Sequence, residues 1–332
     1  MIPHPVLDAL TYVVAGRGLQ VSARLGLFEI ISQGPIAAGQ LAKKINADTE
    51  GTNQLIGVLE ALGYVKEDTK GKFSLTKMGK KFFFAKSDYS MRNTVLFSDY
   101  VYNSLGNLEE NIKRGGPKNV NLDVFTPQQW EIFNNTMIEV AKTNAREIAN
   151  MITLSRDYKK LLDIGGSHGL HAIEICKKIP GLTAEILDLK PVEKFANETI
   201  KKYKMTDRVK FRVGDFHKDN LGRGYDIILA FNIIHGLKPE LNIRLTEKIF
   251  KALNPGGIYV ILDQIKEAQG KSELSKLVSS AQGLMLFNVA GGRTYSFDEV
   301  QNWLKKTGFK KSEMKKLRAP GNALIIGKRL SK

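Results

Sequence analysis

The spacing of apolar and polar residues predicts an N-terminal region built mainly of helices. Residues 6–33 place apolar side chains at helical spacing and end at the chain breaker Gly34-Pro35. The segment 48–64 repeats that spacing, and short strands at 64–67 and 72–75 follow it. Helices followed by a two-stranded wing are the order of a winged-helix domain.

Residues 90–155 also follow a helical pattern. Thr126 is a good N-cap, and Pro127 suits the first helical position. Two interpretations of the apolar stripe that follows stay open: core packing, or the wall of a substrate pocket. The stripe consists of Trp130, Phe133, Met137, Ala141, Ala145, Ile148 and Ile152.

From residue 159 onward, strands and helices alternate. Strands are predicted at 160–164, 183–188, 209–213, 225–232 and 257–263, with helical segments between them. This alternation is typical of a doubly wound, Rossmann-like parallel sheet. A hairpin at 313–318 and 322–329 should add an antiparallel last strand. The predicted fold class is therefore α/β, preceded by a mainly α winged-helix domain.

The net charge of +16 suggests a nucleic-acid partner until its position is considered. Residues 1–150 carry +2 and residues 151–332 carry +14. The helix that precedes the wing, over 48–64, contains Asp48, Glu50 and Glu60 but no lysine or arginine. Because phosphate neutralisation supplies most affinity for DNA, this acidic helix argues against a DNA-binding regulator, which we keep as the alternative from another functional class.

Several other classes are disfavoured by composition. Cys176 is the only cysteine, so neither a disulfide framework nor a multi-cysteine zinc site fits within one chain. The histidines show no metal-ligand spacing, and we expect no metal. We find no apolar stretch long enough for a membrane span and no leader pattern, so a cytoplasmic protein is expected.

A glycine-rich turn follows the first strand of the predicted sheet, in LLDIGGSHG at 161–169. Glycines there let a ligand approach the backbone and the free amides of a helix N-terminus. The spacing Gly165-Gly166-x-x-Gly169 differs from the G-x-G-x-x-G of dinucleotide binders, which disfavours an NAD-dependent dehydrogenase. His168 and His171 flank this turn and are expected on the loop and helix surface.

Three carboxylates are predicted at the carboxyl ends of three successive strands. Asp163 precedes the glycines and can accept a hydrogen bond from a ligand amino group. Asp188 ends the second strand, where a carboxylate can hold a ribose. Asp215 and Phe216 follow the third strand and suit an adenine amino group and ring face. Together they indicate S-adenosylmethionine as the cofactor.

The winged helix, LLDIGGSHG, Asp188, the GDF segment and AFNIIHGL together resemble the dimeric S-adenosylmethionine-dependent O-methyltransferases of the hydroxyneurosporene, caffeate and plant-natural-product type. The resemblance implies a homodimer with a winged-helix dimerisation domain at 1–100, a helical bridge roofing the active site at 101–155 and a cofactor-binding methyltransferase domain at 156–332. The expected cofactor residues are Asp163, Gly165, Gly166, Gly169, Asp188, Leu189, Asp215, Phe216 and Asn232.

The resemblance also implies a general base. His235 stands where the family has the histidine that takes the proton from a substrate hydroxyl, and Asp263 matches the carboxylate that orients it. A base with a pKa near 7 suits this reaction. Three positions depart from the family pattern: Gly236 replaces an aspartate, Gly292 and Arg293 stand where a further glutamate is expected, and Phe231 replaces the lysine of some members.

The acceptor is the least determined part of the prediction. Asn288 matches a substrate-contacting asparagine of the family, and the expected pocket residues are Phe133, Met137, Met285, Phe287 and Asn288. They suit a small hydroxylated aromatic or quinol-like molecule. Methylation of carbon or nitrogen on a similar small molecule is the alternative that the missing glutamate and Gly236 leave open.

Overall fold

The structure is a computed structural model that describes residues 5–84, 86–118 and 125–331. Its residues group into two compact units: one holds 1–103 and 131–143, and the other holds 104–130 and 144–332. The boundaries at 100 and 155 expected from the sequence stay a prediction.

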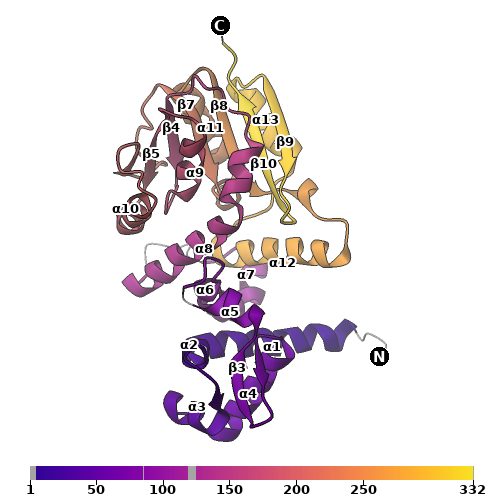
Figure 1. The fold of residues 1–332 in the computed structure, drawn as a ribbon. Coiled ribbons are helices and arrows are strands. Elements are labelled where there is room, and N and C mark those ends of the chain that lie inside the picture. The colour runs from indigo at the N-terminus through magenta and orange to yellow at the C-terminus, as the bar shows by residue number, and fades with distance from the viewer. Residues whose placement is uncertain (1–4, 85, 119–124, 332) are drawn as a thin grey trace. The chain divides into compact units, whose positions relative to one another are not determined.

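The N-terminal unit is helical with a small sheet (Figure 1). Its elements in chain order are α1 (Pro5–Arg24), α2 (Leu27–Ser32), β1 (Ile36–Ala37), α3 (Ala38–Ile45), α4 (Thr49–Ala61), β2 (Val65–Glu67), β3 (Lys72–Leu75), α5 (Lys77–Phe83) and α6 (Arg92–Ser104). The two expected wing strands are present, and β1 adds a third that pairs antiparallel with β3. The helix expected over 6–33 is divided, because Gly26 adopts φ +74° between α1 and α2.

Local sequence explains the helix starts in this unit. Asp48 caps α4 by accepting a hydrogen bond from the Gly51 amide at 2.8 Å, and Thr76 caps α5 in the same way. The core of the unit stacks the rings of Phe28 and Phe83 at a centroid distance of 3.8 Å, with Tyr64 edge-on to both. Through these contacts, α2, α5 and the turn before β2 pack around one apolar cluster.

The C-terminal unit contains the predicted doubly wound sheet. Its strands are β4 (Lys160–Ile164), β5 (Thr183–Asp188), β6 (Val209–Val213), β7 (Tyr225–Phe231), β8 (Leu253–Gln264), β9 (Lys311–Lys316) and β10 (Asn322–Lys328). They lie in the order β6-β5-β4-β7-β8-β10-β9, and β10 is antiparallel to both neighbours. The predicted fold class is confirmed.

Helices cover both faces of this sheet (Figure 1). The helices of the unit are η1 (Leu105–Asn107), α7 (Leu108–Arg114), the two ends of α8 (Pro127–Met151), α9 (Leu170–Lys178), η3 (Lys190–Val192), α10 (Glu193–Lys202), η4 (Ile234–Gly236), α11 (Pro239–Ala252), η5 (Lys266–Ala268), α12 (Glu273–Ala290) and α13 (Phe297–Thr307). One apolar cluster joins the sheet to α9, α10 and the end of α8, and a second joins it to α11 and α13. Leu161 and Leu162, adjacent on β4, enter opposite clusters, as the strand period requires.

Thr126 begins α8 as the sequence predicts. Its hydroxyl accepts a hydrogen bond from the Gln129 amide, and the Gln129 side chain accepts one from the Thr126 amide at 2.8 Å. This reciprocal capping box satisfies two amides that the first helical turn leaves unpaired, so the long helix has a defined start.

Candidate active site

The glycine turn between β4 and α9 has a backbone that few residue types adopt. Gly165 and Gly169 have φ of +61° and +71°, and Ser167 between them has φ of +46°. A Cβ atom added to Gly169 would lie 2.2 Å from Ile186 Cδ1 on β5. Glycine at 169 therefore permits the close packing of α9 on the sheet and keeps the helix N-terminus at the strand ends.

Two separate segments converge on Gly165. A Cβ atom at this position would meet Ile233 Cδ1 at 2.5 Å and Phe216 Cε1 at 3.6 Å. Phe216 comes from the segment after β6, and Ile233 comes from the segment after β7. The structure thus brings the GDF segment and the end of the fourth parallel strand to the glycine turn, as the sequence predicts for one ligand site.

Two predicted cofactor carboxylates face the same turn. Asp188 accepts hydrogen bonds from the amides of Ser167 at 2.8 Å and Leu189 at 2.7 Å. Burial raises the pKa of Asp188 although these bonds oppose the rise. Asp163 is 2% exposed, and burial together with the charge of Asp188 raises its pKa to about 8. A ligand that places a cation between them would relieve both effects.

Asp215 lies in a more open position than the other two carboxylates. Its Oδ1 accepts a hydrogen bond from the His217 amide at 2.9 Å, and Lys218 Nζ lies 3.3 Å from Oδ2. Burial raises the pKa of Asp215, but these two contacts outweigh burial and hold the pKa below its ordinary value. Asp215 is therefore ionised at neutral pH, and both of its oxygens can accept hydrogen bonds from an amino group.

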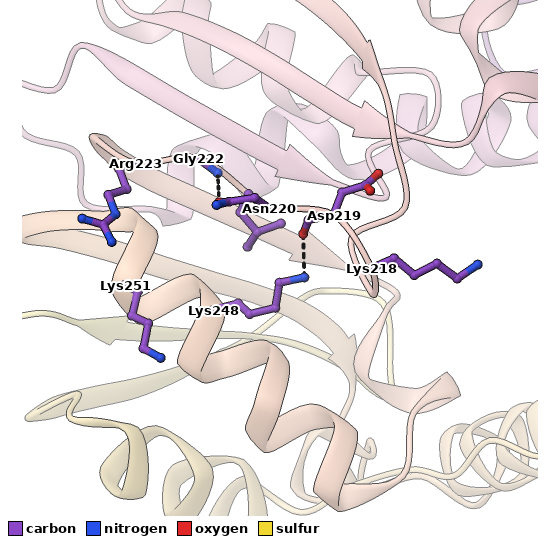
Figure 2. A pocket seen from close by; sticks show the side chains of 8 residues that line it. Lys218, Asp219, Asn220, Gly222, Arg223, Lys248 and Lys251 are labelled. Atoms are coloured by element: carbon purple, nitrogen blue, oxygen red, sulfur yellow. Dashed lines mark hydrogen bonds between the residues drawn. The ribbon is translucent and has the colours of Figure 1, made fainter.

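Lys248, which the sequence did not single out, fastens the GDF segment from α11. Its Nζ donates to the carbonyl oxygens of Phe216 at 2.6 Å and Asp219 at 2.7 Å, the latter drawn in Figure 2. Asp219 in turn accepts a hydrogen bond from the Asp215 amide at 2.7 Å. The ammonium group thus holds the loop that carries both expected adenine contacts. Beside this loop is a cavity of about 300 Å³ lined by Lys218, Asp219, Asn220, Leu221, Gly222, Arg223, Lys248 and Lys251.

His235 and Asp263 form a direct pair. His235 lies in η4 after β7, and its Nδ1 is 2.8 Å from Oδ1 of Asp263 on β8, while its backbone amide donates to Oδ2 at 3.2 Å. Asp263 is fully buried and also accepts from the Gln264 amide at 2.7 Å. Burial lowers the pKa of His235, but the charge of Asp263 and this hydrogen bond outweigh burial and raise it above its ordinary value.

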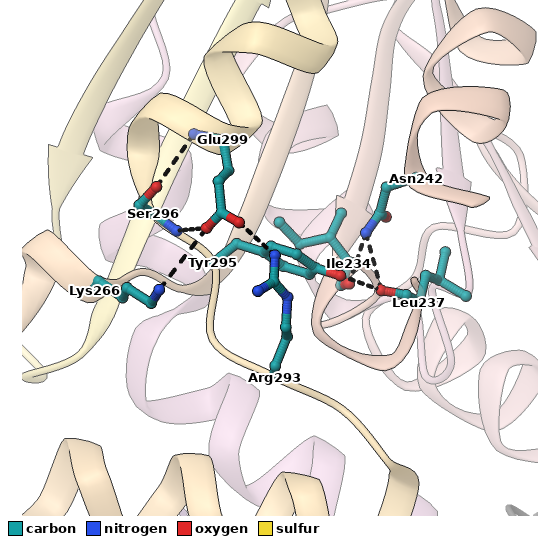
Figure 3. Close-up of polar contacts among 8 residues, drawn as sticks. All are labelled: Ile234, Leu237, Asn242, Lys266, Arg293, Tyr295, Ser296 and Glu299. Atoms are coloured by element: carbon teal, nitrogen blue, oxygen red, sulfur yellow. Dashed lines mark hydrogen bonds and ion pairs between the residues drawn. The ribbon is translucent and has the colours of Figure 1, made fainter. Parts of the chain in front are cut away.

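The turn that carries His235 is held from two further elements (Figure 3). Asn242 on α11 donates to the carbonyl oxygens of Ile234 at 3.0 Å and Leu237 at 3.2 Å. The hydroxyl of Tyr295, a fully buried residue, donates to the same Leu237 oxygen at 2.5 Å. These bonds satisfy the carbonyls of Ile234 and Leu237 and so hold the backbone of the turn from which the His235 ring projects.

Two of the positions that depart from the family pattern, Gly292 and Arg293, lie against the His235 carbonyl oxygen. A Cβ atom on Gly292 would lie 2.6 Å from the His235 carbonyl oxygen, so a side chain there needs a shift of the backbone. The Arg293 amide donates to that oxygen at 2.9 Å, and its guanidinium pairs with Glu299 (Figure 3). Neither residue offers a carboxylate to His235, so Asp263 alone supplies the carboxylate contact described above.

Of the expected acceptor residues, Met285, Phe287 and Asn288 lie on α12, which packs against η4. Asn288 is buried, its Nδ2 donates to the Ser104 carbonyl oxygen at 3.1 Å, and its Oδ1 accepts from Asn111 at 2.9 Å. These contacts tie α12 to Ser104, the last residue of α6, and to α7, and a contact of Asn288 with substrate stays a prediction. Phe133 and Met137 lie in the N-terminal unit, where the Phe133 ring is 5.5 Å from that of Phe97.

Both histidines next to the glycine turn are buried. His168 and His171 are 4% and 9% exposed, so the expected surface position was wrong for both.

Within 5–84, 86–118 and 125–331, no helix has the length and apolar character to span a bilayer, and no group of three or more His, Cys, Asp or Glu residues could hold a metal ion.

Comparison with known proteins agrees with this geometry. Residues 118–310 match the family model described as an O-methyltransferase domain, and residues 7–84 match an O-methyltransferase dimerisation domain. O-methyltransferase 4 of Dictyostelium discoideum is 26% identical over 98% of this chain and 95% of its own. L-tyrosine C(3)-methyltransferase of Streptomyces lavendulae is 24% identical over 95% and 90% of the two chains.

The fold is also found among solved structures. Human N-acetylserotonin methyltransferase, solved in complex with S-adenosylmethionine, superposes with a TM-score of 0.86 over 99% of both chains at 19% identity. At this level of identity the superposition establishes the shared fold, and the acceptor of each protein must be considered separately.

Proposed function

Because the chain belongs to the S-adenosylmethionine-dependent O-methyltransferase family, we propose that it methylates a hydroxyl group of a small aromatic acceptor with His235 as the general base. The observation that carries this proposal is the pair of His235 and Asp263, in which His235 lies two residues beyond Ile233, the residue in contact with the glycine turn. The chain is a methyltransferase, and its methyl donor is S-adenosylmethionine; the roles of individual residues and the acceptor are what we propose.

The residues of the glycine turn fit this donor. Asp163 would bind the α-ammonium, Asp188 the ribose hydroxyls, and Asp215 with Phe216 the adenine. Gly165, Gly166, Gly169, Leu189 and Asn232 would line the backbone side of the site. The raised pKa of Asp163 supports its part, because a buried acid with this pKa gains most from a cationic ligand. When bound, the donor supplies an electrophilic methyl group.

The base chemistry follows from the tautomer that Asp263 selects. A buried carboxylate 2.8 Å from Nδ1 favours a proton on that nitrogen, which leaves the lone pair of Nε2 free. Nε2 would take the proton of an acceptor hydroxyl while the methyl group passes from the donor's sulfur to that oxygen and S-adenosylhomocysteine leaves. Asp263 would stabilise the resulting imidazolium. The family glutamate has no counterpart here, so this single pair would carry the whole proton transfer.

The acceptor class is proposed from chemistry and from relatives. Met285 and Phe287 on α12 would supply an apolar wall for a flat ring, and Asn288 would contribute a polar contact. The part expected of Phe133 and Met137 on α8 stays a prediction. Tyrosine and N-acetylserotonin, named for two similar proteins, are both hydroxylated aromatics. Because one relative is named L-tyrosine C(3)-methyltransferase, methylation of carbon stays the alternative.

The test is identification of the product. The protein is incubated with methyl-labelled S-adenosylmethionine and a panel of phenols, hydroxyindoles, hydroquinones and arylamines, and products are located by mass spectrometry and NMR. A labelled methyl on oxygen supports the proposal, whereas a methyl on ring carbon or nitrogen supports the alternative. Asp188→Ala should abolish donor binding in calorimetry, and unchanged affinity would contradict the cofactor site.

We further propose that the protein is a homodimer formed through its dimerisation domain. Val6, Leu10 and Val14 on α1 are each more than half exposed and recur at helical spacing. Light scattering should give twice the chain mass of 37.0 kDa. The DNA-binding alternative requires salt-dependent duplex binding in a gel shift, which the acidic α4 disfavours. The cytoplasmic location stays a prediction.

A further inference from the structure

His171 carries a buried ring nitrogen that no described residue satisfies. The side chain lies in the first turn of α9, directly after the glycine turn, and is 9% exposed. Its Nδ1 is buried and lacks a hydrogen-bond partner within 5–84, 86–118 and 125–331. Buried polar atoms in proteins are nearly always hydrogen-bonded, so an unsatisfied atom beside a ligand site indicates a missing partner.

The ring of His171 lies at the point where ligands bind in a doubly wound sheet. It meets the ring of Phe231, the last residue of β7, edge to face at 5.0 Å. The chain proceeds from β4 outward through β5 and β6, then returns to place β7 on the other side of β4. The boundary between β4 and β7 is therefore the topological switch point, where the crevice at the strand ends opens.

Asp163 shares this face of the sheet with Phe231 and His171. Asp163 pairs with Leu229 across the β4–β7 ladder, and Phe231 lies two residues further along β7. Because side chains alternate between faces with a period of two, Asp163 and Phe231 point to the same side. This is the side that α9 covers, since Ala172 of α9 belongs to the same apolar cluster as Phe231.

The order of the strands fixes the order of the donor's parts in the proposed site. Adenine would lie at the end of β6 and ribose at the end of β5, so the methionine part would lie at β4 and β7. That part carries an ammonium and a carboxylate on one carbon. Asp163 suits the ammonium and repels the carboxylate, which needs a hydrogen-bond donor close by.

We propose that His171 binds the donor's α-carboxylate through Nδ1, an inference that rests on the proposed cofactor site. Burial lowers the pKa of His171 to about 4, so the imidazole is neutral and can carry one N–H toward the carboxylate. Asp163 and His171 together would then grip both charged groups of the methionine part. His171 would set affinity for the donor without taking part in proton transfer at His235.

The test compares two ligands that differ only in the carboxylate: S-adenosylmethionine and decarboxylated S-adenosylmethionine. His171→Phe keeps an aromatic ring against Phe231 and removes Nδ1. Calorimetry on this variant should show S-adenosylmethionine bound about 10- to 100-fold more weakly, the usual cost of one hydrogen bond to a charged group, with decarboxylated donor little changed. His171→Asn, whose amide can replace Nδ1, should retain most of the affinity.

Controls separate this inference from the proposed function. Asp188→Ala should weaken both ligands, and if it weakens neither, the cofactor site itself is wrong. If Asp188→Ala behaves as expected but His171→Phe weakens both ligands equally, or neither, then His171 does not bind the carboxylate. Should His171→Phe fail to fold, His171→Leu gives the same comparison, because the ratio of the two affinities does not depend on the folded fraction.

Discussion

Nδ1 of His235 lies 2.8 Å from Oδ1 of Asp263, a fully buried carboxylate that also accepts bonds from two backbone amides. The hydrogen bonds from these two amides hold the Asp263 carboxylate in one orientation, so the imidazole has a hydrogen-bond partner in a fixed position. Residues 28 positions apart are joined because η4 follows β7 and Asp263 lies on the adjacent strand β8.

Asp263→Asn should lower the turnover number by roughly 10²–10⁴-fold, since the amide can present the wrong hydrogen-bonding group to Nδ1. In the wild type, Asp263 raises the pKa of His235, so the rate should fall as the pH drops through that raised value. Without the charge the pKa falls, and the acidic limb should move to lower pH. The pH dependence of turnover for both proteins checks this. An acidic limb at the same pH in the variant would show that another group titrates.

Tyr295→Phe removes the hydroxyl that donates to the Leu237 carbonyl oxygen at 2.5 Å. The free energy of unfolding should fall by about 1 kcal/mol, the net value of one buried hydrogen bond. Turnover should fall roughly fivefold, because the His235 turn is less well held. The KM for the methyl donor should not change. Tyr158→Phe is the matched control, since its hydroxyl donates to the Gly256 carbonyl oxygen at 3.2 Å and leaves the His235 turn untouched. Equal turnover in Tyr295→Phe and the wild type would contradict a positioning role.

Lys248→Met keeps the length of the side chain but removes the ammonium that binds the carbonyl oxygens of Phe216, His217 and Asp219. The loop with Asp215 and Phe216 should loosen, and affinity for S-adenosylhomocysteine should fall roughly 10-fold or more, as for the loss of one or two charge-assisted bonds. Calorimetry measures this. Lys251→Met, on the same helix and beside the same cavity, is the control and should bind as the wild type does.

Asp163→Asn should stabilise the unliganded protein at alkaline pH while weakening donor binding. In the folded wild type the pKa is about 8, against 3.8 for the ordinary carboxyl, so between these values the folded state holds a proton that the unfolded chain releases. The free energy of unfolding therefore falls as the pH rises through this window, and the asparagine variant lacks that loss. Thermal unfolding at pH 4.5 and 8.5 should show the gap in Tm widening in favour of the variant. A gap that narrows with pH would be contrary to the burial of this carboxyl.

The first three parallel strands of the sheet were predictable because each is a short segment rich in apolar residues between polar turns. β4, β5 and β6 begin and end at the predicted residues. The division of the first helix at Gly26 was not predictable, since one glycine within an apolar stripe is compatible with a continuous helix. The family resemblance and the cofactor class are confirmed; the cofactor class depended on motifs at the strand ends, and the resemblance depended also on the winged helix.

The contacts that hold the site could not be predicted from the sequence pattern. Lys248 binds carbonyl oxygens about 30 positions earlier in the chain, and Asn288 bonds Asn111, which is 177 positions away. Periodicity assigns a residue to a face of a helix but does not say which backbone atom that face will meet. His171 shows the same limit: its helical position was correct, but its burial depends on Phe231, which reaches it only through the sheet order.

The most direct test of the account is turnover and donor affinity of His235→Ala, measured on the same preparation with an acceptor identified from the panel. We predict that turnover falls roughly 10²–10⁴-fold, while calorimetry gives the wild-type affinity for S-adenosylhomocysteine. Near-wild-type turnover would contradict the assignment of His235 as the general base, and would mean that the acceptor arrives already ionised or that carbon or nitrogen is methylated.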